Sequence, residues 1–363
     1  MFQKTDPIRG LLGVVLSLLL VTLVGRLMIV GKSFLLPIIL AVISVYILVA
    51  ATEALRRTPL TRKLPEWALR MLVLIGFLII VVWFGSVMVS TASQVNERLP
   101  EYQDNLTGLY HEVTGMLGLD ASPDLQEVFK NVRESLPLGE VAGMILGSIS
   151  SAAGLIFMVT IYAMFLMGER GGFAHKIAVA LPGDRSKRAG KIISDINSSI
   201  SSYIAVKTLV NATLGAISFC VMWVIGVDFA LFWAILIGVL NYIPYVGSWL
   251  GVIFPVLLSM AQFGSVEKTL LVAALLTGAQ LWVGNSLEPR MVGQRVNMSP
   301  FIVLVALALW SSVWGIAGAI LAIPLTSIIA IIMGSFESTR PFTVLIAQDV
   351  TPFETDTTAE AHN

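Results

Sequence analysis

Charged residues are scarce in this sequence. Asp, Glu, Lys and Arg make up 13% of the 363 residues, whereas 56% are hydrophobic, and a soluble domain of this size carries roughly 25% charged residues. The deficit lies in long charge-free runs, which bilayer-spanning segments require and water-facing surfaces do not. The 23 basic and 23 acidic residues cancel, which argues against a nucleic-acid partner, because phosphate binding needs a clustered excess of Lys and Arg. The composition predicts an all-α polytopic membrane protein.

Residues that carry catalysis or bind metals are also few. The single cysteine, Cys220, lies in an apolar run, so no internal disulfide can form. The three histidines (His111, His175 and His362) lie outside the apolar runs, which excludes intramembrane Ser–His or HExxH hydrolysis. No Cys/His cluster indicates a metal site. The segment GDRSKRAGK has six residues between its glycines, where a nucleotide-binding loop has four, and Ile rather than Ser or Thr follows its last lysine. We therefore expect no enzyme, no cofactor and no metal.

The apolar runs predict six membrane-spanning helices. Five runs have ordinary span length, at about 10–30, 33–51, 71–89, 208–227 and 269–287. A sixth, 141–168, is longer, so we expect it to be tilted or to begin at the interface. Its small residues Gly143, Gly147 and Ser151 recur every four positions, a spacing that permits close packing within one chain or between subunits. The first run follows a charged start without a cleavage site, so we expect a retained span.

Two further runs are too long for one span. Residues 229–266 include no charge over 38 positions, and residues 296–336 include none over 41. As straight helices they would be roughly 57 and 61 Å long, against a hydrocarbon core of about 30 Å. We predict that each turns back as a re-entrant helical hairpin, giving six spans plus two hairpins. The alternative in each run is a tilted, kinked span followed by an interfacial helix, or about eight spans in all.

Glycines and prolines near the middle of these runs are expected to interrupt the helices and to act as hairpin or gating positions. Paired interruptions of this kind indicate a transporter binding site. The positions are Pro244, Gly247, Gly251 and Pro255 in the first run, Pro289, Gly293 and Pro300 around the start of the second, and Gly315, Gly318 and Pro324 within it.

The charges of the loops predict the orientation. Loop 53–70 carries five basic and two acidic residues and loop 168–207 seven and three, so both are expected in the cytoplasm; segment 92–140, with nine acidic and three basic residues, is expected outside. If both hairpins are re-entrant, span 208–227 with its hairpin enters the membrane from inside, and span 269–287 with its hairpin enters from outside. The two units then form an inverted repeat, which is suited to alternating access. The expected parts are N-terminal spans (1–91), an external helical segment (92–140), a fourth span with a basic loop (141–207), a transport core (208–336) and a disordered cytoplasmic tail (337–363), with both termini cytoplasmic.

The external segment has its own helical pattern. Six apolar residues recur at four and three positions, as in a heptad seam: Val95, Leu99, Tyr102, Leu106, Leu109 and Val113. Ser122 and Pro123 predict the start of a second amphipathic helix. The two helices either pack on each other or contribute a subunit contact, and Pro100 interrupts the first.

Ionisable residues near the membrane are candidate functional residues, because holding them there is costly. Lys207 either anchors its helix at the cytoplasmic surface or faces the solute. Asp228 is expected to mark a hydrated turn. Glu288 and Arg290 either form a charge pair that braces a turn, or Arg290 holds an anionic or polyhydroxyl solute that Glu288 orients. Three neutral residues at breaks in the apolar runs suit a polar uncharged solute or a weakly held cation; these are Asn241, Asn285 and Ser299.

The sequence resembles the autoinducer-2 exporter family of PerM-like permeases. The resemblance is carried by VDFALFWAILIGVLNYIPYVG and by NSLEPRMVGQRVNMSPFIVLVALALWSSVWGIAGAILAIPLT, with SSYIAVKT and LPEYQDNL upstream, and it is strongest over 197–327. The matching positions are Asn241, Pro244, Gly247, Asn285, Glu288, Pro289, Arg290, Gly293, Ser299, Pro300 and Pro324.

The resemblance implies a multi-pass transport protein of the bacterial inner membrane. It also implies a homo-oligomer, with a pentamer as one form. Some members are associated with export of autoinducer-2 and others with sodium(lithium)/proton antiport. We therefore expect export of a small hydrophilic solute from a site between the two hairpins. The alternatives are cation/proton antiport, which the shortage of intramembrane carboxylates disfavours, and a non-transporting scaffold whose external helices bind a partner.

Overall fold

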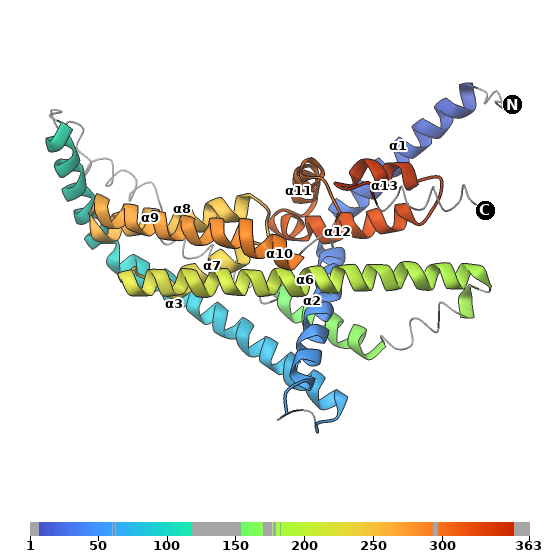
Figure 1. Cartoon of the computed structure of the whole chain (residues 1–363), viewed down its shortest axis with the longest axis horizontal. Coiled ribbons are helices and arrows are strands. Elements are labelled where there is room, and N and C mark those ends of the chain that lie inside the picture. Colours follow the sequence, from blue (N-terminus) through green and yellow to red (C-terminus); the bar gives the residue numbers. More distant parts are fainter. Residues whose placement is uncertain are drawn as a thin grey trace. The chain divides into compact units, whose positions relative to one another are not determined.

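The computed structural model describes residues 7–117 except 60 and 62, 154–169, 176, 179–292 except 182, and 297–351. All regular elements in these residues are helices (Figure 1). The helices are α1 (Pro7–Val30), α2 (Lys32–Arg56), α3 (Glu66–Leu117), an unlabelled helix (Gly154–Glu169), α6 (Asp184–Ile225), α7 (Ala230–Leu240), α8 (Val246–Phe263), α9 (Val266–Trp282), the π-helix η1 (Val283–Leu287), α10 (Glu288–Val292), α11 (Pro300–Trp314), α12 (Ile316–Gly334) and α13 (Arg340–Ile346). Seven helical segments in these residues are long and apolar enough to cross a membrane. The predicted all-α polytopic class is confirmed.

The five runs of ordinary span length lie in α1, α2, α3, α6 and the continuous helix α9–η1. In α1, leucines and valines are exposed on all sides of the helix, as expected of a segment solvated by lipid. Of the sixth run, residues 154–168 are helical. Gly143, Gly147 and Ser151 lie outside the described residues.

The first long run is broken into two helices, as predicted. α7 ends at Leu240, a turn follows, and α8 begins at Val246. A Cβ on Gly247 would lie 1.8 Å from the Leu240 carbonyl oxygen, so the returning chain passes directly against the end of α7 and only glycine fits. α7 has 11 residues, or about 16 Å, which is half of a hydrocarbon core.

The second long run has the same construction. α11 ends at Trp314, Gly315 adopts φ 65°, and α12 begins at once. A Cβ on Gly318 would lie 1.9 Å from the Trp310 carbonyl oxygen. Both long runs therefore contain a tight reversal whose closeness depends on one glycine.

The other predicted interruptions do not all break a helix. Gly251 and Pro255 lie inside α8, and Pro324 lies inside α12; the expectation that these three interrupt the helices is wrong. Each proline costs one intrahelical hydrogen bond, a loss that packed membrane helices tolerate. Of the remaining positions, Pro244 lies in the turn, Pro289 in α10 and Pro300 at the first residue of α11, and Gly293 lies outside the described residues.

α3 joins the third span to the external segment without a break. It runs for 52 residues and includes Pro100, so the predicted interruption there is wrong. Tyr102 and Leu109 of the apolar seam are buried, and this part of α3 packs against α8. The seam thus makes contacts within the chain. The predicted second helix after Ser122 lies outside the described residues.

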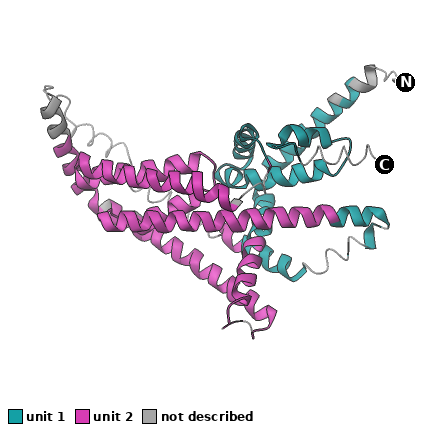
Figure 2. Cartoon of the chain, viewed as in Figure 1, with its two compact units in different colours: residues 1–44, 158–190, 298–363 teal, residues 45–157, 191–297 magenta. Residues whose placement is uncertain are grey.

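The chain forms two compact units (Figure 2). One contains residues 1–44, 158–190 and 298–363. Its core is formed by Leu36 of α2 with apolar residues of α11 and α12, including Trp310 and Trp314, whose rings contact each other at a tilt of 37°. The Trp314 indole N–H donates to the Met28 carbonyl at 3.0 Å. α13, which packs against α12, forms within the tail that we expected to be disordered.

The other unit contains residues 45–157 and 191–297. Its buried core lies between α6, α7 and α9 and is made of aliphatic residues: Val210, Leu214, Met222, Val227, Ala230, Ala234, Ile237, Val272, Leu276 and Val283. Two glycines let α6 and α7 cross closely. A Cβ on Gly215 would lie 3.0 Å from the Ala234 carbonyl oxygen, and one on Gly238 would lie 3.2 Å from that of Asn211.

Candidate functional site

The two ends of the α7–α8 hairpin are joined by hydrogen bonds. The Gln262 amide donates to the Gly226 carbonyl at 2.8 Å, and the Asp228 backbone N–H donates to Gln262 Oε1 at 2.8 Å. Gly226 and Asp228 precede α7, and Gln262 is near the end of α8. The first long run therefore returns to the level at which it began, as a hairpin must.

α3 binds this base of the hairpin. Arg98 Nη1 donates to both oxygens of Asp228, at 2.8 and 2.7 Å, and the Tyr102 hydroxyl donates to one of them at 2.8 Å. Asn105 donates to the Gln262 carbonyl at 2.7 Å. We call these six residues, Arg98, Tyr102, Asn105, Gly226, Asp228 and Gln262, the base cluster.

Asp228 is not the hydrated turn residue that we expected. Its side chain is 14% exposed, and both of its oxygens accept hydrogen bonds from α3. Burial and the bond to Asp228 raise the pKa of Tyr102, so its phenol keeps the proton that it donates. The sequence analysis missed this arrangement because Arg98 lies 130 positions before Asp228.

The turn of the hairpin carries a buried network of neutral polar side chains. Asn241 Nδ2 donates to Asn211 Oδ1 of α6 at 2.8 Å. Asn241 Oδ1 accepts from Ser248 Oγ at 3.2 Å and from Gln280 Nε2 of α9 at 2.9 Å, and Gln280 Nε2 lies 2.7 Å from Ser248 Oγ. We call Asn211, Asn241, Ser248 and Gln280 the tip cluster. Asn241 thus lies at the centre of a hydrogen-bonded network, and its role in binding a solute stays a prediction.

The tip also contacts α6 one turn away. The hydroxyls of Tyr242 and Thr208 lie 2.7 Å apart. Asn211 lies 14 residues before Ile225, the end of α6 next to the base cluster, and Gln280 lies 14 residues after Val266, the start of α9. Along either helix, the tip cluster is therefore roughly 21 Å from the base cluster. The hairpin therefore extends along most of the length of its neighbours.

A buried ion pair lies beyond the tip. Lys207 of α6 is 5% exposed, and its Nζ donates to Glu288 Oε1 at 2.5 Å. A lysine that snorkels to the surface would expose its ammonium group, so this burial does not fit the snorkelling alternative for Lys207, and the alternative that it faces the solute stays a prediction. Arg290 is exposed on α10, and Glu288 pairs with Lys207 rather than with Arg290 among the described residues. Tyr203 is buried on the same face of α6.

The remaining predicted residues lie away from this cluster. Asn285 is exposed in η1, a π-helical turn between Gln280 and Glu288, and such turns are frequent at functional sites. Ser299 belongs to the other unit; its hydroxyl accepts from the Ile302 N–H at 3.4 Å and caps α11. Of the six predicted binding residues, the structure pairs Lys207 with Glu288. Asn241 contacts Asn211, one helical turn of α6 from Lys207.

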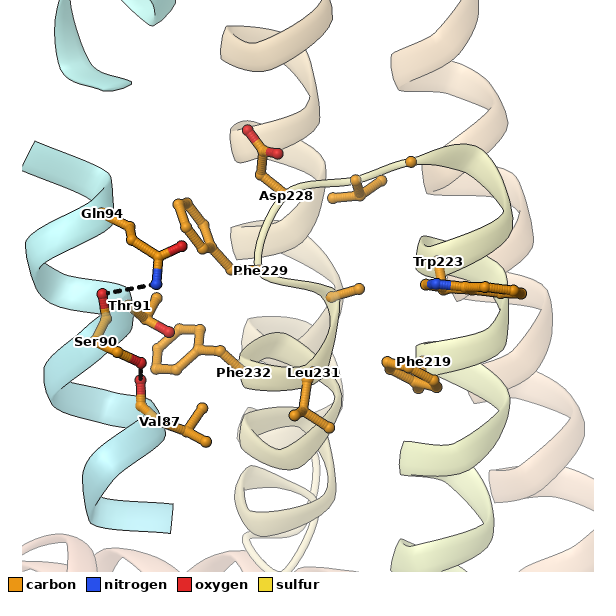
Figure 3. Close-up of a pocket in the computed structure, with 13 residues that line it drawn as sticks. Val87, Ser90, Thr91, Gln94, Phe219, Trp223, Asp228, Phe229, Leu231 and Phe232 are labelled. Atoms are coloured by element: carbon orange, nitrogen blue, oxygen red, sulfur yellow. Dashed lines mark hydrogen bonds between the residues drawn. The ribbon is translucent and has the colours of Figure 1, made fainter. Parts of the chain in front are cut away.

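A cleft of about 570 Å³ lies beside the base cluster, lined by α3, the end of α6 and the start of α7. Figure 3 shows Ser90, Gln94 and Asp228 along its polar edge, and the aromatic side chains of Phe232 and Trp223 among the apolar ones. Its size falls in the range of small-molecule sites. Among the described residues, no group of His, Cys, Asp or Glu could hold a metal ion.

Comparison with known proteins gives consistent matches over most of the chain. The family model described as AI-2E family transporter matches residues 16–338. A Borreliella burgdorferi protein, named only as a candidate transport protein, is 31% identical over 251 residues, which cover 69% of this chain and 68% of the relative. The AI-2 transport protein TqsA of Escherichia coli K12 is 25% identical over 344 residues, which cover 91% of this chain and 96% of the relative.

Proposed function

Because the chain belongs to the AI-2E family of transporters, we propose that it exports a small hydrophilic solute of the autoinducer-2 type by alternating access. Transport across a membrane follows from the family, and because the relatives reported above are bacterial proteins, we place the chain in the inner membrane. The solute class takes support from the relative named for AI-2 transport. Assembly as a homo-oligomer stays a prediction from the family resemblance.

The observation that carries the mechanism is the α7–α8 hairpin with its buried polar tip. Non-helical backbone at membrane depth is tolerated only where protein or a watery cavity surrounds it. Here the turn is surrounded by Asn211, Ser248 and Gln280, which are hydrogen-bonding groups of the kind that bind polar solutes in broken-helix transporters. A purely structural turn could be satisfied by its own backbone.

The orientation follows from the charges of the loops. The base cluster includes residues of the acidic external segment, so we place it at the outer surface. Lys207 lies 18 residues before Ile225, or about 27 Å further in, and so falls near the inner surface of a core about 30 Å thick. The tip cluster then lies inside the bilayer, and Arg290 and both termini are cytoplasmic.

Alternating access would result from movement of the hairpin against α3, α6 and α9. The cleft beside the base cluster is open, whereas Asn211 and Asn241 of the tip cluster are buried. This arrangement corresponds to a state closed toward the cytoplasm. Withdrawal of the tip from Asn211 and Gln280 would open the inner side.

Transport into proteoliposomes tests the proposal. Vesicles of purified protein, with labelled autoinducer-2 on one side, should show saturable flux above protein-free vesicles. Gln280→Leu should reduce this flux at least tenfold, because polar groups of the bound solute would be buried against an apolar side chain without a hydrogen bond. The matched control is Gln94→Leu, which lies in the outer cleft on α3. Equal loss in both variants, or flux unchanged by Gln280→Leu, would contradict a role for the tip.

The Lys207–Glu288 pair favours cation/proton antiport as a second candidate. The sequence offered no buried carboxylate as a proton carrier, and the structure places the partly exposed Glu288 against the buried Lys207. An imposed sodium gradient should then acidify or alkalinise the vesicle lumen, and Glu288→Gln should abolish the change. A luminal pH that does not change when a sodium or lithium gradient is imposed would exclude this candidate.

A further inference from the structure

We propose that the tip cluster is the binding site for the solute and that it takes an uncharged molecule, whose hydroxyl or carbonyl oxygen accepts a hydrogen bond from Asn211. The inference rests on the proposed function and narrows its substrate class. Three observations support it: Asn211 has an unpaired side-chain donor, the tip cluster has no carboxylate, and the nearby charges of Lys207 and Glu288 balance.

The unused donor is the side-chain amide nitrogen of Asn211. Asn211 is 3% exposed, and its Nδ2 has no hydrogen-bond partner among the described residues. Buried polar groups in folded proteins almost always have a hydrogen-bond partner, and a buried donor without one lowers the stability of the fold. The donor lies in the one part of the unit where the hairpin turn, α6 and α9 converge, so a ligand there would satisfy it.

The cluster has no carboxylate. Its four side chains are neutral, and the carboxamide oxygens of Asn211 and Asn241 already accept hydrogen bonds within it. A bound cation is held by several oxygen ligands, usually with carboxylates among them, whereas a solute oxygen needs a free donor. The site therefore favours a solute with acceptor oxygens over a metal ion.

The charges near the tip cancel. Lys207 lies one helical turn from Asn211 on the buried face of α6, and its ammonium group is paired with Glu288. A carboxylate or phosphate on the solute would enter a buried site without a counter-charge, which is strongly unfavourable. The site should therefore reject anions of the same shape as its neutral ligand.

The solute can reach Asn211 only when α7 moves. Asn211 is 3% exposed, and its Nδ2 is buried. α7 packs tightly on this turn of α6, because a Cβ on Gly238 would lie 3.2 Å from the Asn211 carbonyl oxygen. The donor is thus closed to solvent in this state. Binding of solute in place of the hairpin contact would couple occupancy of the site to the hairpin movement.

Three probes with one carbon skeleton and different charge test this inference: ribose, ribonate and ribose 5-phosphate, each labelled, in proteoliposomes. The wild-type protein should transport ribose with saturable kinetics and should transport neither ribonate nor ribose 5-phosphate. Asn211→Leu, which keeps the side-chain volume but removes the donor, should raise the half-saturating ribose concentration about three- to tenfold, as expected for one neutral hydrogen bond. Ser218→Ala, also on the buried face of α6, should leave it unchanged.

The outcomes separate the two proposals. Ribose flux that is insensitive to Asn211→Leu, or equal flux of ribose and ribonate, would overturn the binding site and leave transport standing. Absence of ribose flux in vesicles that transport autoinducer-2 would overturn the solute class assigned to the site, and absence of autoinducer-2 flux as well would contradict both proposals. If Asn211→Leu fails to fold, Asn211→Cys in a Cys220→Ser background gives a second measurement. Ribose should protect this cysteine from a thiol reagent, and ribonate should not; equal protection, or none, would overturn the site.

Discussion

Neutralising Glu288 should destabilise the protein through the lysine that it leaves behind. In Glu288→Gln, Lys207 stays 5% exposed and loses the carboxylate 2.5 Å away. Removing one partner of a buried ion pair costs about 3–5 kcal/mol of the free energy of unfolding. Because Glu288 is 29% exposed, water reaches the pair, and we expect about 3 kcal/mol, the lower end of that range. Lys207→Met should cost less, since the remaining carboxylate can be hydrated.

The double variant Lys207→Met/Glu288→Gln separates this effect from a loss of packing. Without either charge the desolvation penalty disappears, so the double variant should be less destabilised than the sum of the singles by at least about 1 kcal/mol. SDS titration in mixed micelles would measure all four proteins. The matched control is Asp184→Asn in the exposed pair with Lys187, where we expect no measurable change. Additive single effects, or a Glu288→Gln variant as stable as wild type, would refute the reasoning.

Three further predictions concern the hairpin. Gly247→Ala should prevent folding or destabilise by more than about 4 kcal/mol, because its Cβ would lie 1.8 Å from the Leu240 carbonyl; Gly278→Ala, with no atom within 4 Å, should be neutral in the same melting assay. Asp228→Asn should lower the free energy of unfolding by about 2 kcal/mol, because two charge-assisted bonds from Arg98 weaken, and a loss below about 0.5 kcal/mol would contradict that role. The Arg290→Ala variant should transport normally, because the Arg290 side chain is exposed. A loss of flux would show that Arg290 takes part in solute binding.

The sequence was sufficient to predict where the chain reverses. A charge-free run of 38 residues cannot remain a straight helix in a bilayer, and the structure breaks it at Asn241–Tyr245. Asn241 was predicted because a neutral amide at such a break needs partners. The sequence could not say which glycine or proline makes the break. Gly247 does so because it meets the carbonyl of Leu240, whereas Pro255 is accommodated within α8.

The partners of the site were not predictable, because they lie far apart in the chain. Lys207 and Glu288 are separated by 81 positions and Asn241 and Gln280 by 39, so each looked like an isolated residue with a local role. Asn211 carried a detectable signal that was overlooked. It follows Lys207 by four positions, so both lie on one face of the same helix, and an amide inside an apolar span needs a partner as a charge does.

The central claim is that residues 229–266 return to the side of the membrane from which they start. Single cysteines at Glu97, Glu267 and Arg290, three exposed positions, in a Cys220→Ser background would test it with an impermeant thiol reagent in intact cells. We predict that Glu97→Cys and Glu267→Cys are labelled from outside and Arg290→Cys only after permeabilisation. Labelling of Arg290→Cys from outside together with a protected Glu267→Cys would mean that the run crosses the bilayer, and would contradict the hairpin.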